Sequence, residues 1–286
     1  YLDKIKDQNP NLAKLSDTEI LNFLNMIVEG KPTLACTLLF SIYPQMLYPQ
    51  YTVNAMVIMG YERGDTAYDG ARFIDNKRIE GTLAGILDET MRFITKNMQV
   101  KTTIDAHSGK RIDKTEYPVI AIREAVLNAL VHRDYSIHTQ GMPIEVIMYK
   151  DRLEIRNPGG LYGRLTIDTL GKVQPDTRNP VLARAMETLG LTENRYSGIP
   201  TIRREMGQAN MRAPVFKDSR NEFVVTLYND DSNQVREHST YRTLVDFCHE
   251  PRSRAEIAAF IGITSMNWVM KYHIQPLLND GKLLMS

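Results

Sequence analysis

One stretch of this sequence, residues 118–133, constrains the fold more than any other. It is mostly apolar, yet Glu124, Asn128 and His132 interrupt it at intervals of four residues. A helix places residues four apart on one face, so these three side chains share a polar stripe. A second face is wholly apolar and would pack on a sheet; it holds Ile122, Val126, Ala129 and Leu130. The stretch therefore predicts a helix that lies against a sheet and presents one polar edge.

The polar stripe combines two side chains with complementary chemistry. A carboxylate can polarise a water molecule, and an amide oxygen can bind Mg²⁺ beside phosphate groups. Glu124 is therefore the candidate general base and Asn128 the candidate Mg²⁺ ligand. The alternative interpretation is an ordinary solvated helix face, on which Glu and Asn at this spacing are common.

Two turns with glycine follow this helix along the chain. A predicted strand at 153–157 leads into Pro158, Gly159 and Gly160, and later Ser197 and Gly198 open a predicted helix. Glycine lets the backbone approach a ligand closely, and a helix N-terminus offers free N–H groups to phosphate. Either turn alone is more often a plain loop, but their order after the Glu124 and Asn128 helix favours a phosphate-bearing ligand.

The rest of the chain alternates between helical and strand patterns, which predicts an α+β protein. Helices are predicted at 16–29 (with a capping box from Ser16 to Glu19), 81–98, 118–133, 181–189 and 198–208. Strands are predicted at 34–42, 53–59, 72–80, 101–105, 110–117, 143–149, 153–157, 213–217 and 222–228. The polar stretch 229–234 reads as a linker, so we divide the chain into segments 1–115, 116–230 and 239–286.

The last segment has the outline of a winged helix-turn-helix. Helices at 239–249, 253–261 and 265–278 precede a short apolar tail, and Pro276 should end or bend the third helix. The side chains expected to face duplex DNA from the third helix are Ser265, Asn267, Lys271 and Tyr272. This segment carries five Lys or Arg against four Asp or Glu, a thin basic footprint. A protein-interaction or dimerisation module is the alternative.

Composition narrows the class of protein further. Hydrophobic residues make up 43% and charged residues 24% of the 286, and the net charge is +1, so any nucleic-acid contact must be local. The two cysteines, Cys36 and Cys248, suggest a reducing compartment, and the histidines show no zinc-ligand spacing. The longest apolar stretch, 34–43, is too short to span a bilayer, so we expect a cytoplasmic protein without membrane contact.

Four segments, taken in their order, carry a resemblance to a known family: REAVLNALVHRDYS (123–136), RLEIRNPGGL (152–161), TRNPVLARAMETLGL (177–191) and SGIPTIRREM (197–206). The sequence resembles the "RecG-related" putative transcriptional regulators, in which a Schlafen AlbA-type domain precedes a GHKL-like ATPase module and often a winged helix. Upstream, PTLACTLLF (32–40) is similar to the segment that joins the first two domains. The resemblance implies that the AlbA-type domain precedes Tyr1. No G-x-x-x-x-G-K-[ST] motif occurs in this chain, so we expect no P-loop helicase motor in it.

The resemblance implies a GHKL-like α/β sandwich, with helices on one face of a mixed, largely antiparallel sheet. An α+β segment would precede it and the winged helix-turn-helix would follow. It implies ATP and Mg²⁺ as ligands, with Glu124 as general base and Asn128 as the Mg²⁺ ligand. The residues expected to bind the nucleotide are Asn128, His132, Asn157, Gly159, Gly160, Ser197 and Gly198, and stretch 161–179 would be the lid.

Two positions depart from the family pattern. Asn157 stands where an adenine-binding Asp is usual, and a neutral amide oxygen is a weaker acceptor than a carboxylate. Tyr196 stands where the phosphate turn usually begins with glycine.

The leading hypothesis is an ATP-responsive, DNA-binding transcriptional regulator. The alternatives are a slow ATPase, a degenerate GHKL scaffold for protein interaction, and a DNA-binding regulator that senses something other than ATP. A homodimer would suit such a regulator, and no stretch of the sequence identifies its interface.

Overall fold

The structure is a computed structural model and describes most of the chain. The residues outside the description are 66–71, 105–110, 175, 193–196, 220, 230–243, 246, 262–265, 280, 282 and 284–286. No helix among the described residues is long and apolar enough to cross a membrane.

A six-stranded mixed sheet organises the molecule, in the order β4-β3-β7-β8-β10-β9. Its strands are β3 (Val53–Ile58), β4 (Phe73–Ile79), β7 (Ile144–Met148), β8 (Arg152–Pro158), β9 (Val215–Asp218) and β10 (Glu222–Tyr228). Only the β3–β7 pair among these is parallel. This confirms the predicted α+β class with a mixed, largely antiparallel sheet, an arrangement compatible with a GHKL-like sandwich.

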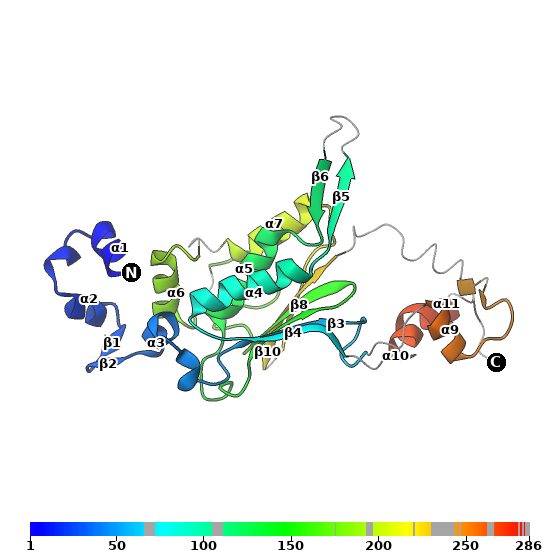
Figure 1. The fold of residues 1–286 in the computed structure, drawn as a ribbon, viewed down its shortest axis with the longest axis horizontal. Coiled ribbons are helices and arrows are strands. Elements are labelled where there is room, and N and C mark those ends of the chain that lie inside the picture. The colour runs from blue at the N-terminus through cyan, green and yellow to red at the C-terminus, as the bar shows by residue number, and fades with distance from the viewer. Residues whose placement is uncertain are drawn as a thin grey trace.

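Helices cover one face of this sheet (Figure 1). They are α4 (Leu83–Asn97), α5 (Val119–His132) and α7 (Gly198–Gln208), with α6 (Pro180–Thr188) nearby in the chain. The central helix α5 buries Ala121, Ile122, Ala125, Val126, Leu127, Ala129, Leu130 and Val131. It packs against α4, α7 and β8, and its polar stripe stays outside the apolar core.

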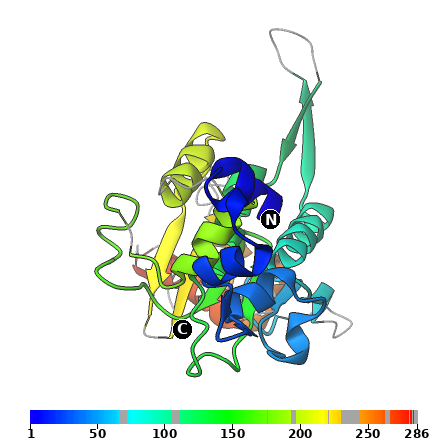
Figure 2. The same ribbon diagram turned by 90° about the vertical axis from the view of Figure 1, so that its left-hand side faces the viewer.

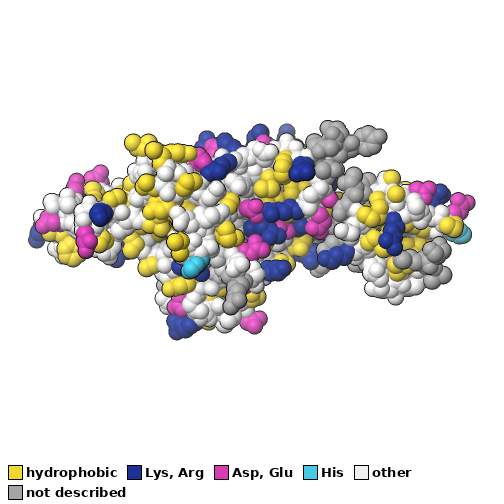
Figure 3. Space-filling view, turned by 90° about the horizontal axis from the view of Figure 1, so that it is seen from below, with side chains coloured by type: hydrophobic (Ala, Val, Ile, Leu, Met, Phe, Trp, Pro, Cys, Tyr) yellow, Lys and Arg dark blue, Asp and Glu magenta, His cyan; other side chains and the backbone are white. Residues whose placement is uncertain are grey.

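The opposite face of the sheet carries charged side chains over its middle, as Figure 3 shows. On β8, the Glu154 carboxylate lies 2.7 Å from the Arg152 guanidinium and 3.0 Å from that of Arg156. Arg156 also lies 3.1 Å from Glu222 on β10. Neighbouring strands thus pair their charges across this face.

The segment before residue 116 contributes to the central sheet. It supplies β3 and β4, and β3 joins β7 from the other side of that boundary. One buried core runs from Met26 to Leu227. The hairpin of β5 (Val100–Ile104) and β6 (Arg111–Thr115) forms its own two-stranded sheet and projects away from this body (Figures 1 and 2).

Two sequence predictions in the N-terminal part need correction. Residues 34–42 were expected to be a strand, but α3 (Leu34–Phe40) is a helix whose N-cap Thr33 accepts a hydrogen bond from the Cys36 amide at 3.4 Å. A short apolar run has no period that distinguishes a strand from a buried helix, whereas the N-cap hydrogen bond of Thr33 stabilises the helix here. Helix α2 (Asp17–Phe23) starts at the predicted capping box but ends early, before Asn25 takes a left-handed φ of 54°.

The remaining N-terminal elements are short. They are α1 (Leu2–Gln8), the 3₁₀ turns at Leu12–Lys14 and Pro44–Met46, and the two-stranded pair β1 (Ile27–Val28) and β2 (Lys31–Pro32).

The C-terminal part shows α9 (Arg254–Ile261) where a helix was predicted. Beyond it come α10 (Met266–Val269), a π-helical turn at Met270–Ile274 and α11 (Gln275–Asn279). The helical chain therefore continues past Pro276. A proline lacks the N–H of a regular helical hydrogen bond, and the wider π-helical turn directly before α11 is a helical irregularity that accommodates such a residue. Most of the predicted helix 239–249 and most of the closing tail lie outside the described residues, so the winged helix stays a prediction.

The small C-terminal core contains Leu244, Ile257, Ala258, Val269, Ile274 and Leu277. Beside this core Phe260 is 45% exposed, and its ring stacks on Phe247 with centroids 4.0 Å apart.

Candidate functional site

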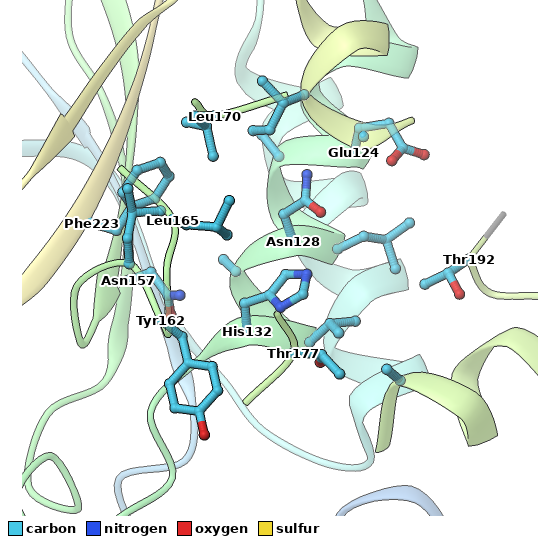
Figure 4. A pocket seen from close by; sticks show the side chains of 18 of the residues that line it. Glu124, Asn128, His132, Asn157, Tyr162, Leu165, Leu170, Thr177, Thr192 and Phe223 are labelled. Atoms are coloured by element: carbon cyan, nitrogen blue, oxygen red, sulfur yellow. The ribbon is translucent and has the colours of Figure 1, made fainter. Parts of the chain in front are cut away.

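A cavity of about 590 Å³ lies between helix α5 and the sheet (Figure 4). Strands β8 and β10 form one wall, α5 forms another, and α6, the start of α7 and residues from 161–177 complete it. This volume falls within the range of small-molecule sites. All eight residues predicted for catalysis or nucleotide binding line it: Glu124, Asn128, His132, Asn157, Gly159, Gly160, Ser197 and Gly198.

The helix wall presents the polar stripe of α5 as the sequence predicted. Glu124, Asn128 and His132 follow one another along the helix beside the cavity (Figure 4). The Asn128 amide also lies against the first turn of α7, where a Cβ on Gly198 would come within 2.7 Å of Asn128 Nδ2. Glycine at position 198 is therefore needed for α7 to approach Asn128 this closely.

The sheet wall places Asn157 opposite the helix. Asn157 lies near the end of β8, where a paired strand fixes its backbone, and only 5% of it is exposed. Phe223, its register partner on β10, supplies an apolar surface beside it (Figure 4). The sheet thus offers one amide within an otherwise apolar wall.

The two glycines after β8 are required by the protein's own packing. Gly159 has a φ of +90°, and a Cβ there would lie 2.5 Å from Asp134 Cβ. A Cβ on Gly160 would lie 2.6 Å from Asp218 Oδ1 and 2.7 Å from the Ser219 carbonyl oxygen. Both residues line the cavity, but the space that their missing side chains leave is filled by these neighbouring groups.

An irregular stretch, 161–179, closes the third side. Its apolar and aromatic side chains over the cavity are Leu161, Tyr162, Leu165, Leu170 and Val173. Its end is anchored by Arg178, which lies 2.5 Å from Asp134 Oδ2 and donates to the Gly160 carbonyl at 3.1 Å. A second pair, Arg164 and Asp176 at 3.1 Å, joins the two arms of the stretch at the surface. Whether this stretch moves as a lid stays a prediction.

Three buried polar atoms in the cavity walls have no hydrogen-bond partner within the described part of the chain. They are Asn128 Nδ2, Asn157 Oδ1 and Thr177 Oγ1. An unsatisfied buried polar atom costs about 1–3 kcal/mol unless a ligand or water completes it. Other buried polar atoms without a partner among the described residues lie elsewhere, such as Thr52 Oγ1 and Thr90 Oγ1, so what distinguishes the three cavity atoms is that they share one space. They come from three separate elements and line one cavity, which fits a ligand that carries both donors and acceptors.

His132 sits half-buried among these groups. Burial first, and then the nearby Arg178 guanidinium, lower the pKa of His132 below its usual value of 6.5. The imidazole is therefore neutral at pH 7, with one ring nitrogen as a donor and the other as an acceptor. Among the residues that the structure describes, no three His, Cys, Asp or Glu side chains gather closely enough to hold a metal ion.

Two of the predicted DNA-facing residues, Asn267 and Lys271, are described and do not line this cavity. Asn267 on α10 and Lys271 on the π-helical turn are both exposed. Ser265 and the side chain of Tyr272 lie outside the description, as does Tyr196 of the phosphate turn.

Sequence reasoning missed several residues of the site. Thr177 and Arg178 stand in the resembling segment 177–191, but nothing in that segment singles them out. Tyr162 and Leu170 come from irregular chain without periodicity, and Phe223 from a strand with no distinguishing motif.

Comparison with known proteins identifies an ATPase-like domain in the part of the chain that includes β8 and β10, the strands of the cavity wall. Residues 141–227 match the family model described as "Putative ATP-dependent DNA helicase recG C-terminal", so the chain carries a RecG-related ATPase-like domain there. The match begins after α5 and does not include Glu124, Asn128 or His132. No curated protein sequence matches the chain.

The fold has a solved counterpart. The crystal structure of the DIP2311 protein from Corynebacterium diphtheriae is similar, with a TM-score of 0.59 and 24% sequence identity. The similarity covers 79% of this chain but only 44% of that protein, so the chain spans less than half of its relative's length.

Proposed function

We propose that this chain binds ATP together with Mg²⁺ in the cavity between α5 and the sheet. The observation that carries the proposal is the set of unsatisfied polar atoms of Asn128, Asn157 and Thr177, which point to a ligand rich in donors and acceptors. The ATPase-like domain at 141–227 supports the choice of nucleotide. The cavity also has apolar walls, which suit a purine ring.

Each polar residue has a task that follows from its chemistry. Asn157 Oδ1 would accept a hydrogen bond from the exocyclic amino group of adenine while Phe223 contacts the ring. Asn128 would turn its amide oxygen toward the cation, since a half-turn about the end of its side chain exchanges oxygen and nitrogen. Ser197 and Gly198 would offer backbone N–H groups at the start of α7 to the phosphates. The bound Mg²⁺ would neutralise phosphate charge.

A slow ATPase is the second candidate activity. Glu124 lines the same cavity and stands one helical turn from Asn128, so its carboxylate would be placed to take a proton from an attacking water. ATP hydrolysis would require the nucleotide site, but the site could bind ATP without hydrolysing it.

We further propose that the protein is a DNA-binding transcriptional regulator. The family model is named after a DNA-acting protein, and Asn267 and Lys271 are exposed on one C-terminal segment. For ATP to regulate DNA binding, the nucleotide must bind two conformations with different affinity. Stretch 161–179 would provide the difference, since it lines the cavity and is anchored at Arg178.

Thermal melting with and without MgATP tests the nucleotide proposal. A ligand at about one hundred times its Kd stabilises the native state by about 2.7 kcal/mol, which appears as a higher Tm. We expect the wild type to show this shift and Asn157→Ala to lose most of it. Ile120→Ala is the matched control, because Ile120 lies on α5 but is 54% exposed and does not line the cavity. An equal shift in the wild type and Asn157→Ala would reject the assigned role of Asn157.

A further inference from the structure

The outer edge of β4 is an open side of the central sheet. Among the strands that the structure describes, β4 ends the sheet and has a neighbour only on its β3 side. It is seven residues long and contains no proline, and Phe73 and Ile74 at its start are 42% and 60% exposed. Proteins usually shorten, cover or interrupt such an edge, because its unpaired backbone groups can bind another strand.

The hydrogen bonds of the sheet show which residues of β4 face outward. The Ile144 amide donates to the Thr52 carbonyl at 3.0 Å, so in the parallel β3–β7 ladder the even-numbered residues of β3 bond to β7. The odd-numbered residues of β3 therefore bond to β4, where they face Asp75, Lys77 and Ile79. It follows that Asn76 and Arg78, in the regular part of the ladder, direct their N–H and C=O groups toward the open edge.

The sequence of this edge is complementary to itself. If a second copy lies antiparallel with a two-fold axis at Asn76, each Asn76 exchanges two backbone hydrogen bonds with its counterpart. Asp75 then faces Lys77 of the other copy in a non-hydrogen-bonded pair, where side chains are closest. Within each copy Asp75 already pairs with Lys96 at 3.0 Å and Lys77 with Glu89, so the two Asp–Lys contacts would extend these ion pairs across the interface. The irregularity of the β3–β4 pair lies at the Phe73 end and leaves this central part regular.

Apolar side chains flank the same edge. Met46 and Leu47 are 78% and 65% exposed. Their segment lies beside the end of β4, since the Arg78 guanidinium donates to the Pro49 carbonyl oxygen. Antiparallel pairing would bring the exposed Phe73 of the second copy toward this end of the strand, so apolar surface would meet apolar surface.

We propose that two copies of this chain associate through β4 into a symmetric dimer with one continuous sheet. The cavity lies against β8 and β10, at a distance of two or more strands from this edge, so both nucleotide sites stay open in the dimer. The interface does not depend on the proposed function of the cavity.

Sedimentation equilibrium of the wild type, Asn76→Pro and Asn76→Ala tests the interface. Proline at 76 removes an outward N–H that β3 does not use, so each copy keeps its own sheet. Alanine at 76 keeps the N–H and is the matched control. We expect a dimer for the wild type and Asn76→Ala, and a dimerisation constant at least about tenfold weaker for Asn76→Pro, because two central hydrogen bonds are lost.

Three results would overturn the proposal: a monomeric wild type at about 100 µM, an unchanged dimer in Asn76→Pro, or equal weakening by proline and alanine. Melting curves establish that each variant is folded. If Asn76→Pro does not fold, Arg78→Pro replaces it, because Arg78 pairs regularly with Asn54 and also directs its N–H outward. A dimer that persists unchanged in a folded Arg78→Pro variant would likewise contradict the proposal.

Discussion

Gly198→Ala is the substitution whose effect follows most directly from the cavity geometry. Gly198 is the first residue of α7, and a Cβ there would lie 2.7 Å from Asn128 Nδ2 and 3.0 Å from Asn128 Oδ1. Alanine is otherwise favourable at a helical position. The substitution therefore acts on one neighbour, the Asn128 amide.

The size of the effect can be worked out from these distances. Ordinary contact begins at 3.4 Å, so the amide must move by about 0.7 Å away from Gly198. Metal–ligand distances tolerate only about 0.2 Å, so Asn128 would no longer be a good Mg²⁺ ligand. A lost contact to a charged group costs about 1.5–3 kcal/mol, which corresponds to MgATP binding weakened about tenfold to more than a hundredfold.

The assay is a titration of MgATP with melting curves of the same samples. Gly207→Ala is the matched control, since it lies on the same helix with nothing within 4 Å of the added Cβ. It should bind MgATP as the wild type does. The folded state of Gly198→Ala should be nearly as stable as that of the wild type, because a side-chain end can move. Wild-type affinity in Gly198→Ala would refute the placement of Asn128 at the ligand.

Three further predictions concern the other proposed roles. Glu124→Gln should lower any ATP hydrolysis at least about a hundredfold with little change in MgATP affinity, and an unchanged rate would exclude Glu124 as the base. The pKa of His132 is lowered in the folded state, so below about pH 6.5 the unfolded chain binds more protons than the folded chain. The free energy of unfolding should therefore fall as the pH falls from there. Urea unfolding at pH 7.5 and 5.5 should show a smaller fall in this free energy for His132→Gln than for the wild type. Lys271→Ala should weaken the binding of duplex DNA and reduce the slope of log affinity against log salt concentration by about one. The exposed control Gln275→Ala should change neither quantity, and equal effects of the two substitutions would argue against a phosphate contact by Lys271.

The elements that the sequence predicted well are those with a strong local pattern. Helix α5 was placed within a residue at each end, because its apolar faces and polar stripe repeat with the helical period. Helix α3 was mistaken for a strand because seven apolar or small residues give no clear period, and the deciding contact is the side chain of Thr33. The hydrophobic pattern of the sequence thus predicts long elements such as α5 correctly, but it cannot tell a helix from a strand in a run as short as α3.

The features that the sequence could not provide are non-local. The parallel pair between β3 and β7 joins residues such as Val53 and Ile144, and no local signal links them. The same holds for the ion pair of Arg178 with Asp134, which anchors stretch 161–179 beside the cavity. The sequence could point to the eight predicted residues that line the cavity because each belongs to a recognisable turn or helix face, whereas Thr177 is noticed only through its unpartnered hydroxyl.

The most direct test of the central claim is isothermal titration calorimetry of ATP, with and without Mg²⁺, into the wild type and Asn128→Ala. The account predicts micromolar, Mg²⁺-dependent binding by the wild type and a loss of at least about tenfold in Asn128→Ala, because the variant lacks the amide that faces the cavity. Absence of binding to the wild type at millimolar ATP would contradict the account. So would equal affinity in the two proteins.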